Sequence, residues 1–349
     1  MKRIYLFIAF VISILFLSCN KEDDIDIRTS TGLYGEANKT LQRFKDWRRN
    51  DDVIIFPIIT DLHSGGNDKY KHISYVMQTD SLFGYDFIAH LGDFGIDVDK
   101  TNTLLKEIST IHEKYNKLTI FCKGNHEDFI SNVAFSNSLQ VPSLNKSKYK
   151  VNIYSNGAFG YYDIDNKKTR IFFLNTSDSI SYCIRKKQLQ YVIDNLSTIP
   201  NNDWCVVFLG HWCPHPIGYW NNSTSQKINH KTFMKILESY ASKKKGVADI
   251  SENINLSWDF TKAKGKLVGY LCGDSHFDTQ VKDNGVNYII TQGYGTISES
   301  QKPQGAITTP FDYNKQMLVD IVAIKPSEGK MKFFRLGAGG SNRDREFYF

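Results

Sequence analysis

Five short polar clusters along the chain contain the residue types that bind metal ions. In chain order they are Asp61-Leu62-His63, Gly92-Asp93, Gly124-Asn125-His126-Glu127, Gly210-His211 and Gly273-Asp274-Ser275-His276. Asp, Asn and His are hard to borderline oxygen and nitrogen donors that suit Mn, Fe, Zn or Mg. A carboxylate can also bridge two such ions about 3.5–4 Å apart, as in two-metal hydrolytic sites. The clusters therefore predict a site for two divalent metal ions.

Each cluster follows an apolar run that is short enough to be a buried strand. The runs are Val53–Ile59, Asp86–Leu91, Leu118–Cys122, Cys205–Leu209 and Leu267–Cys272. In an open α/β sheet the loops that leave the C-terminal ends of the strands converge on one edge, where ligands bind. A single Asp-x-His is a weak signal, and a lone histidine at a strand end is more often a hydrogen-bonded loop residue. Five clusters in this order favour one shared site.

The order and identity of the clusters resemble the calcineurin-like metallophosphoesterases, whose motifs run D-x-H, G-D, G-N-H-[DE], H and G-H-x-H. The third motif is the specific one, and here it follows the apolar Thr119-Ile120-Phe121-Cys122, with one residue between them. The resemblance extends from about Val53 to the C-terminus. It implies an α/β fold, a four-layer αββα sandwich of two mixed β-sheets flanked by helices.

The resemblance also implies a role for each residue. The first metal ion would be held by Asp61, His63, the bridging Asp93 and His276. The second would be held by Asp93, Asn125, His211 and Asp274. A hydroxide between the ions would attack the phosphorus of a phosphate ester in line, while the ions neutralise charge on the phosphoryl oxygens. His126 would protonate or stabilise the leaving oxygen; a loop histidine bonded to backbone is the alternative.

Two positions depart from the family pattern. Asp274 stands where the family usually has His, and a third carboxylate would shift the preference from Zn toward Mn, Fe or Mg, with Mn and Fe favoured. The alternative is that Asp274 does not touch the metal, which would leave one ion weakly held. Ile96 stands where many members have an Asp or His beside the catalytic histidine, with Asp97 one residue further, so what orients His126 stays open. In the fourth motif, His215 is an alternative to His211 as ligand or substrate contact.

The N-terminal segment resembles a bacterial lipoprotein signal peptide over residues 1–18. Lys2 and Arg3 precede an apolar run that is too short to span a bilayer comfortably and ends at Leu17-Ser18-Cys19. Cleavage before Cys19 would leave this residue acylated, and the acyl chains would anchor the protein in a membrane without a spanning helix. An ordinary secretory signal cut nearby is the alternative.

The residues after Cys19 bear on location and tethering. Asn20-Lys21-Glu22-Asp23-Asp24 resembles signals that send lipoproteins to the surface of some Gram-negative bacteria. We therefore expect an outer-membrane or cell-surface lipoprotein, with the periplasmic face as the alternative. Residues 19–35 are expected to form a flexible tether after the acylated cysteine.

One metallophosphoesterase domain is expected over residues 36–349, because the five motifs are spread across it. Apolar spacing predicts helices over Glu36–Arg49, Lys69–Leu82, Asp99–Tyr115, Arg185–Leu196 and Lys231–Ser242. Strands are expected within Val151–Asn175, and a hairpin from Met317–Ala323 and Met331–Leu336. The closing segment, from Arg335 to Phe347, resembles the ending of some bacterial and phage members of the family and has no role that the sequence assigns.

Composition favours a globular protein, because hydrophobic residues make up 41% of the chain. Loss of Lys2 and Arg3 would lower the formal net charge from +6 to +4. The basic residues are dispersed and Lys243-Lys244-Lys245 is expected to be a solvated helix end, so no specific nucleic-acid binding is inferred. Five of the six cysteines remain after Cys19. Those within the expected strands would pack as small hydrophobic residues rather than form a disulfide framework.

The substrate is less well defined by the sequence. Trp212, Tyr219 and Trp220 follow the fourth motif and would either stack on a base or sugar or cap the core. The segment Gln292–Lys315 is expected to form another wall of the pocket. Phosphorylated small molecules, nucleotides, and lipid or glycan phosphate esters all fit, as monoesters, diesters or pyrophosphates. A binding lipoprotein without turnover is the main alternative to an enzyme, and a metal-dependent amidase or peptidase fits the third motif less well.

Overall fold

The computed structural model of the chain describes residues 26–49, 51–64, 68–95, 98–145, 150–155, 157–178, 182–219, 227–250, 254–295 and 297–349. The expected signal peptide, Cys19 and the sorting signal after it lie outside the described residues. So do Ile96, Asp97 and Trp220. No helix in the described part of the chain is long and apolar enough to cross a membrane.

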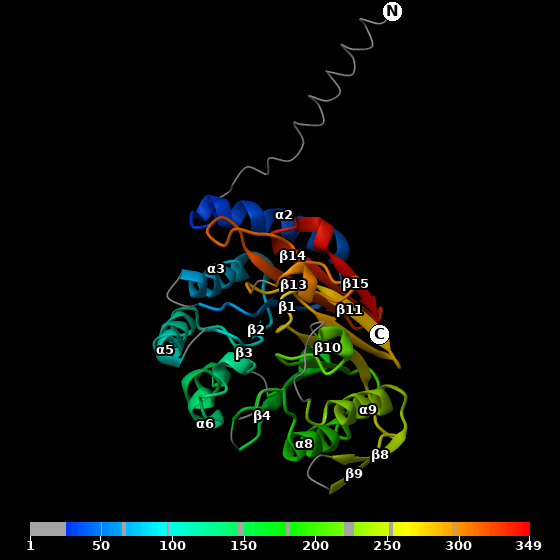
Figure 1. Cartoon of the computed structure of the whole chain (residues 1–349). Coiled ribbons are helices and arrows are strands. Elements are labelled where there is room, and N and C mark those ends of the chain that lie inside the picture. The colour runs from blue at the N-terminus through cyan, green and yellow to red at the C-terminus, as the bar shows by residue number, and fades with distance from the viewer. Residues whose placement is uncertain are drawn as a thin grey trace, which may run out of the picture.

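Two large mixed sheets lie face to face, as Figure 1 shows. The first has six strands in the order β15-β14-β13-β1-β2-β3. Their bounds are β1 (Ile54–Ile59), β2 (Ile88–His90), β3 (Thr119–Phe121), β13 (Leu318–Lys325), β14 (Lys330–Gly337) and β15 (Arg345–Tyr348). Strands β1 to β3 run parallel, whereas β13 to β15 form the antiparallel half. The expected C-terminal hairpin is β13–β14 and is confirmed.

The second sheet has seven strands in the order β11-β12-β10-β7-β6-β5-β4. Their bounds are β4 (Lys150–Ile153), β5 (Gly160–Ile164), β6 (Thr169–Phe173), β7 (Cys205–Leu209), β10 (Lys266–Cys272), β11 (Thr279–Asp283) and β12 (Val286–Ile290). Strands β6, β7, β10 and β12 run parallel in the centre, and antiparallel strands close both edges. The strands predicted ahead of the five motifs are thus all present, each within two residues of its predicted ends.

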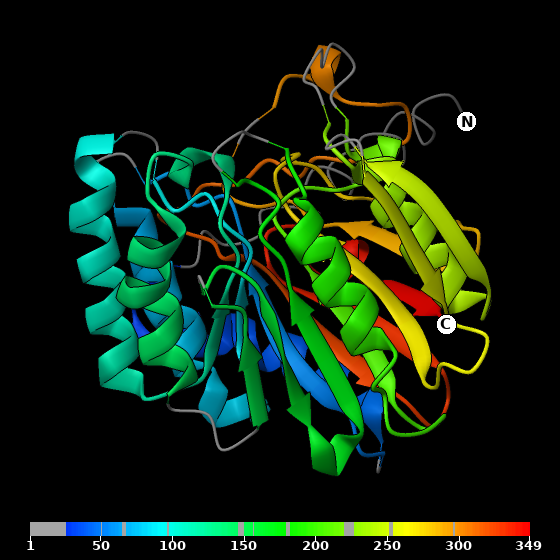
Figure 2. The ribbon, with the colours of Figure 1, turned by 90° about the horizontal axis from the view of Figure 1, so that it is seen from below.

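Helices cover the outer face of each sheet (Figure 1, Figure 2). The first sheet carries α2 (Ser30–Arg48), α3 (Lys71–Gln78), α4 (Asp80–Phe83) and α5 (Val98–Tyr115), and the second carries α8 (Lys186–Leu196) and α9 (His230–Ala241). Short helices α6 (Asn132–Phe135) and α7 (Val141–Leu144) follow β3. Alternation along β1 separates the layers: Ile54, Phe56 and Ile58 face the other sheet, whereas Ile55 and Ile59 face the helices. The four-layer αββα sandwich is therefore confirmed.

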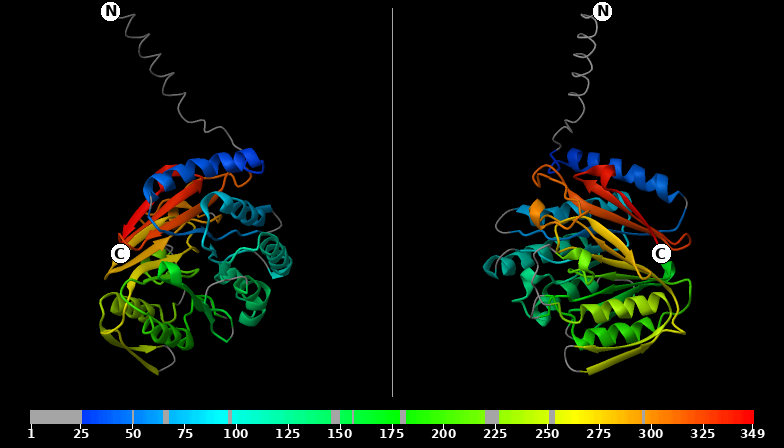
Figure 3. Two further views of the ribbon diagram at one scale, coloured as in Figure 1. Left: turned by 180° about the vertical axis from the view of Figure 1, so that it is seen from behind. Right: turned by 45° about the vertical axis from the view of Figure 1, so that its right-hand side comes forward.

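Two local predictions differ from the structure. Helix α2 lies across β13 and β14 (Figure 3) and begins at Ser30, so residues 30–35 belong to the helix and the prediction of a tether there was wrong. The reason is that Leu33 is buried and extends the apolar stripe of Ala37 and Leu41 by one turn. Lys245 is not a helix end: it opens a separate hairpin, β8 (Lys245–Ile250) and β9 (Ile254–Asp259), which follows α9.

The described cysteines are all free and buried, and for Cys122, Cys205 and Cys272 this burial was predicted from the sequence. Cys122 and Cys205 pack between the two sheets. Cys272 packs between the second sheet and its helices. Burial raises the pKa of the Cys122 and Cys205 thiols to about 12, so both stay protonated and act as apolar groups.

A buried neutral histidine makes the fold sensitive to acid. Tyr294 Oη accepts from Leu318 N and donates to His72 Nδ1 at 2.8 Å, and burial lowers the pKa of His72 to about 4. The unfolded chain therefore binds more protons than the folded chain between pH 6.5 and 4, so stability falls as pH falls through this window. We expect wild type to lose about 2 kcal/mol through His72 between pH 7 and pH 5. Between pH 7 and pH 5, the free energy of unfolding of His72→Gln, measured with urea, should fall by about 2 kcal/mol less than that of wild type. An equal fall in the two proteins would contradict the assignment.

Candidate metal centre

All five motifs lie on loops at the C-terminal ends of parallel strands. They follow β1, β2 and β3 in the first sheet and β7 and β10 in the second. Backbone groups join neighbouring loops: Asp61 N donates to Gly92 O at 3.0 Å, and Gly273 N donates to His211 O at 2.9 Å. Asp274 N donates to Asp61 Oδ2 at 3.1 Å and so connects the two sheets. The loops therefore form one edge that carries all seven predicted metal ligands and His126.

Five of the seven predicted ligands have positive φ angles. They are Asp61 (52°), His63 (44°), Asp93 (56°), Asp274 (64°) and His276 (60°). A non-glycine residue in this region costs of order 1–3 kcal/mol and persists only where its surroundings enforce it, which is common at functional sites. No residue type or spacing in the sequence signals this backbone.

Glycines allow the loops to approach closely. Gly92 has φ 101°, and a Cβ there would lie 2.6 Å from Gly124 N. A Cβ on Gly124 would lie 2.1 Å from Asp93 Oδ1. The glycines of the second and third motifs are therefore required for the contact between their loops.

The first group of donor atoms comes from Asp61, His63 and His276. His63 Nε2 and His276 Nε2 lie 2.9 Å apart, and Asp61 Oδ1 lies 3.5 Å from His276 Nε2. Thr60 Oγ1 donates to Asp61 Oδ2 at 2.7 Å, whereas the buried Oδ1 accepts no hydrogen bond from the described residues. A buried carboxylate oxygen without a partner is costly, and a cation among these three side chains would satisfy it.

The second group surrounds His211. His211 Nδ1 lies 2.6 Å from Leu91 O, so this nitrogen carries a proton and leaves Nε2 to face the site. Nε2 faces Asn125 Oδ1 at 3.0 Å, and Asp93 Oδ2 and Asp274 Oδ1 at 3.4 Å each. Burial alone would lower the pKa of His211, but Asp93 and Asp274 raise it well above its ordinary value. Either a proton on His211 Nε2 or a metal ion bound among these atoms can therefore hold the three oxygens that face this nitrogen.

Asp93 belongs to both groups. Its Oδ2 lies 3.4 Å from His211 Nε2 and 3.7 Å from His63 Nε2. Against the effect of burial, the surrounding histidines, with His211 first, lower the pKa of Asp93 and keep its carboxylate charged. The described residues thus contain Asp and His groups whose donor atoms lie within 4.8 Å of one another and fit a divalent metal.

His126 lies on the open side of the two groups. Its side chain is 34% exposed, whereas the side chains of His211 and Asp61 are fully buried. His126 N donates to Asp93 Oδ1 at 3.0 Å, and its Nε2 lies 3.9 Å from Asp93 Oδ2. The ring is therefore held beside the donor groups and reaches the solvent, as a proton donor to a bound molecule must.

His215 is turned away from these groups. Its Nδ1 accepts from Ile217 N at 3.2 Å, and its Nε2 lies 3.4 Å from Asp283 Oδ2. The alternative of His215 as a ligand therefore has no support in the structure, and His211 is the histidine of the fourth motif that joins the site.

Glu127 completes the third motif without facing the donor atoms, and its role was not predicted from the sequence. Glu127 is fully buried, and its Oε2 accepts from Asp93 N at 2.9 Å and Gly124 N at 3.0 Å. Its Oε1 accepts from Phe94 N at 2.9 Å. Burial, with a contribution from Asp93, raises the pKa of Glu127 to about 7. Glu127 therefore fixes the backbone that carries Asp93.

Glu127→Gln should weaken both the fold and metal binding. The amide of Gln has one oxygen, so its NH2 group would face the N–H of Phe94 instead of accepting from it. We expect a loss of about 3 kcal/mol in the free energy of unfolding at pH 8 and metal affinity lower by about 10–100-fold. Urea unfolding and metal titration measure the two effects; Glu113→Gln, at an exposed position of α5, is the control. Unchanged metal affinity would argue against the positioning role.

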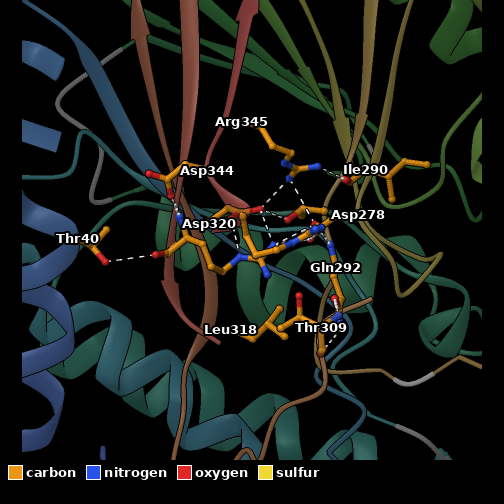
Figure 4. Close-up of polar contacts among 12 residues, drawn as sticks. Thr40, Asp278, Ile290, Gln292, Thr309, Leu318, Asp320, Asp344 and Arg345 are labelled. Carbon is orange, nitrogen blue, oxygen red and sulfur yellow. Dashed lines mark hydrogen bonds and ion pairs between the residues drawn. The ribbon is translucent and has the colours of Figure 1, made fainter. Parts of the chain in front are cut away.

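A buried ion network supports the His276 loop, and Figure 4 shows Asp278, Asp320 and Arg345 turned toward one another. Arg335 Nη2 donates to both carboxylate oxygens of Asp278, at 2.9 and 3.0 Å, and Arg335 Nε donates to Asp320 at 2.8 Å. Asp278 Oδ1 also accepts from Gln292 N at 2.9 Å. The network gives the C-terminal segment, including Arg335 and Arg345, a role that the sequence did not assign.

The expected pocket wall reaches the site through two glycines. A Cβ on Gly295 would lie 2.4 Å from the His276 ring, and one on Gly293 would lie 2.3 Å from Thr60 O. The segment from Gln292 therefore packs directly against the loops that carry Asp61 and His276. Substitution of either glycine would displace a predicted ligand.

Comparison with solved structures places this arrangement in a known fold. A dimetal phosphatase from Danio rerio superposes with a TM-score of 0.56 at 14% sequence identity, over 86% of this chain and 100% of that chain. The chain has the metallophosphoesterase fold. The resemblance that the motifs carry is thus confirmed at the level of the fold.

Other solved structures are more distant. GAP50, the anchor in the inner membrane complex of Plasmodium, has a TM-score of 0.48 at 12% identity, over 85% of this chain and 89% of that chain. The NAD nucleotidase of Haemophilus influenzae has a TM-score of 0.41 at 12% identity, over 85% and 54%. No family model matches the sequence, and no curated protein matches it.

Proposed function

We propose that the protein is a metal-dependent phosphoesterase that hydrolyses phosphate esters with two divalent ions. The observation that carries this proposal is the position of Asp93, whose Oδ2 lies within 3.7 Å of donor nitrogens from both groups. A carboxylate so placed suits a bridging ligand. The metallophosphoesterase fold, shared with the dimetal phosphatase of Danio rerio, supports the same reading.

Each side chain then has a proposed role. Asp61, His63, Asp93 and His276 would hold one ion, and Asp93, Asn125, His211 and Asp274 the other. When bound, two such ions activate water and neutralise charge on the phosphate. His126 would give a proton to the leaving oxygen, since its exposed ring is held by the backbone contact to Asp93.

The types of donor atom indicate which metal ions the site prefers. Asp61, Asp93 and Asp274 supply carboxylates, and Asn125 supplies an amide oxygen, so oxygen donors outnumber the three histidines. Hard oxygen donors favour Mn or Fe over Zn. Phosphorylated small molecules, nucleotides, and lipid or glycan phosphate esters are the proposed substrates.

Asp274→His should make the activity optimum more acidic than that of wild type. The Asp274 carboxylate places one more negative charge beside the site, which opposes the loss of a proton from water there. Its Oδ1 lies 3.4 Å from His211 Nε2, so the effect should be direct. The pH dependence of kcat for both proteins measures it, and an equal or more alkaline optimum in the variant would exclude Asp274 as a ligand.

Hydrolysis of bis-p-nitrophenyl phosphate and p-nitrophenyl phosphate by the full chain tests the proposed function. The assay is run with Mn, Fe, Zn, Mg or a chelator, and metal content is measured in parallel. Release that depends on metal supports a phosphoesterase. Full metal occupancy without release of either product, or hydrolysis of amides alone, would contradict it.

We also propose that the protein is lipid-anchored at Cys19 and faces the outside of the cytoplasm, on the cell surface or in the periplasm. The signal-like segment that ends at Leu17-Ser18-Cys19 supports this proposal. Cys19→Ala should abolish labelling by a fatty-acid probe and release the protein from membranes. Protease treatment of intact cells distinguishes the two locations, because only surface protein would be cut.

A further inference from the structure

Three aromatic rings beside the fourth motif hold a lysine. The ammonium of Lys227 lies 3.5 Å from the ring centroid of Tyr219, 3.8 Å from that of Trp212 and 5.1 Å from that of Tyr182. The rings of Trp212 and Tyr219 are nearly parallel, at 15° and 5.3 Å between centroids, and Tyr182 lies 4.6 Å from Trp212. We call these three rings and Lys227 the aromatic box.

The aromatic box shows which role Trp212 has, stacking on a base or sugar or capping the core. Trp212 is only 1% exposed, so it caps the core and does not itself present a face for stacking on a base. Tyr182, Tyr219 and Lys227 are partly exposed. The group of the box that can meet a bound molecule with a full charge is therefore the Lys227 ammonium.

The charge of Lys227 is held but not neutralised. Aromatic faces attract an ammonium through their quadrupoles and carry no net charge. Among the described residues, no carboxylate forms an ion pair with Lys227. Burial lowers the pKa of Lys227 to about 8. An anion at this position would be favoured because it supplies the missing compensation.

The box lies beside the second group of donor atoms. Trp212 directly follows His211 in the chain, and its backbone oxygen accepts from Tyr270 Oη at 2.8 Å. The ammonium of Lys227 lies 3.8 Å from the Trp212 ring centroid and so sits against the residue that follows His211. A molecule whose scissile phosphate meets His211 and Asp274 would therefore extend toward Lys227.

We propose that Lys227 binds a second anionic group of the substrate, so that the site prefers phosphate esters with a further phosphate or carboxylate. The inference rests on the proposed function, which supplies the position of the scissile phosphate. The rings set the position of the ammonium before binding, so the substrate need not order a mobile lysine. The opposite result would be that the rings bind a cationic group of the substrate, such as a cationic headgroup, in place of Lys227.

Charge-changing variants of the full chain test this proposal. We compare kcat/KM for ADP with kcat/KM for bis-p-nitrophenyl phosphate, which has no second anionic group, in Lys227→Met and Lys227→Arg. The ratio should fall at least tenfold in Lys227→Met and less than threefold in Lys227→Arg, because Arg keeps both the charge and the aromatic stacking. Lys231→Met, at an exposed position of helix α9, removes the same charge and should leave the ratio unchanged.

Two results would overturn the proposal. One is a ratio in Lys227→Met within twofold of wild type, with thermal unfolding showing that the variant is folded. The other is faster hydrolysis of p-nitrophenylphosphocholine by Lys227→Met, which would show that the box binds cations.

A binding measurement separates this inference from the proposed function. Calorimetric titration with inorganic pyrophosphate does not depend on turnover, and its Kd should rise at least tenfold in Lys227→Met. If wild type hydrolyses no phosphate ester but shows this difference, the proposed function fails and the anion site stands. If it hydrolyses esters and binds pyrophosphate equally well with and without Lys227, the anion site fails alone.

Discussion

Replacement of His126 by alanine is expected to lower kcat by about 10²–10⁴-fold while both metal ions stay bound. The imidazole is lost, but the backbone N–H of residue 126, which donates to Asp93 Oδ1, remains. The donor atoms of the two metal groups are therefore undisturbed. Steady-state hydrolysis of p-nitrophenyl phosphate, together with metal analysis of the same sample, measures the effect.

The leaving group provides a further check on His126. A proton donor matters most for a poor leaving group, so the defect should be larger for an alkyl phosphate than for p-nitrophenyl phosphate. His215→Ala is the matched control, because His215 is a loop histidine that contacts Asp283 and lies away from the donor atoms. Equal activity in wild type and His126→Ala, with full metal content, would remove His126 from the mechanism.

Asp93→Asn is expected to have the largest effect, with loss of both metal ions and of kcat by more than about 10³-fold. Asp93 Oδ2 lies close to both His63 Nε2 and His211 Nε2. Replacement of the carboxylate by a neutral amide therefore affects both groups of metal-binding atoms. Metal content per chain should fall from two toward zero, measured by elemental analysis after gel filtration.

The matched control is Asp203→Asn, which removes a carboxylate from an exposed ion pair with Lys168. It should change neither metal content nor kcat. Retention of one tightly bound ion in Asp93→Asn would mean that Asp93 is a ligand of one group only, and retention of two would contradict the bridging role.

The sequence predicts the parts of this site that depend on residue type and strand order. An apolar run that ends in Asp-x-His or Gly-Asp locates a buried strand and its loop, so the positions of Asp61 and Asp93 at one sheet edge follow directly. The pairing of β1 to β3 and of β7 with β10 agrees with this expectation.

Long-range contacts are what the sequence leaves out. Glu127 accepts from the backbone of Phe94, which lies 33 residues earlier, and Arg335 meets Asp278 across 57 residues. Neither pairing has a local pattern, because each depends on how two loops approach in the finished fold. The positive φ angles of Asp61 and His276 likewise arise from tertiary constraint rather than from local preference.

The Arg335–Asp278 contact also bears on when the site forms during biosynthesis. Asp278 lies two residues beyond His276, and its partners Arg335, Arg343 and Arg345 lie 57 to 67 residues further along the chain. An unfinished chain on the ribosome can contain all five motifs and still lack the cations that neutralise Asp278. Contacts of such high sequence separation form late. Assembly of the site should therefore wait until Arg335, Arg343 and Arg345 have left the ribosome, and deletion of β15, which carries Arg345, should prevent it.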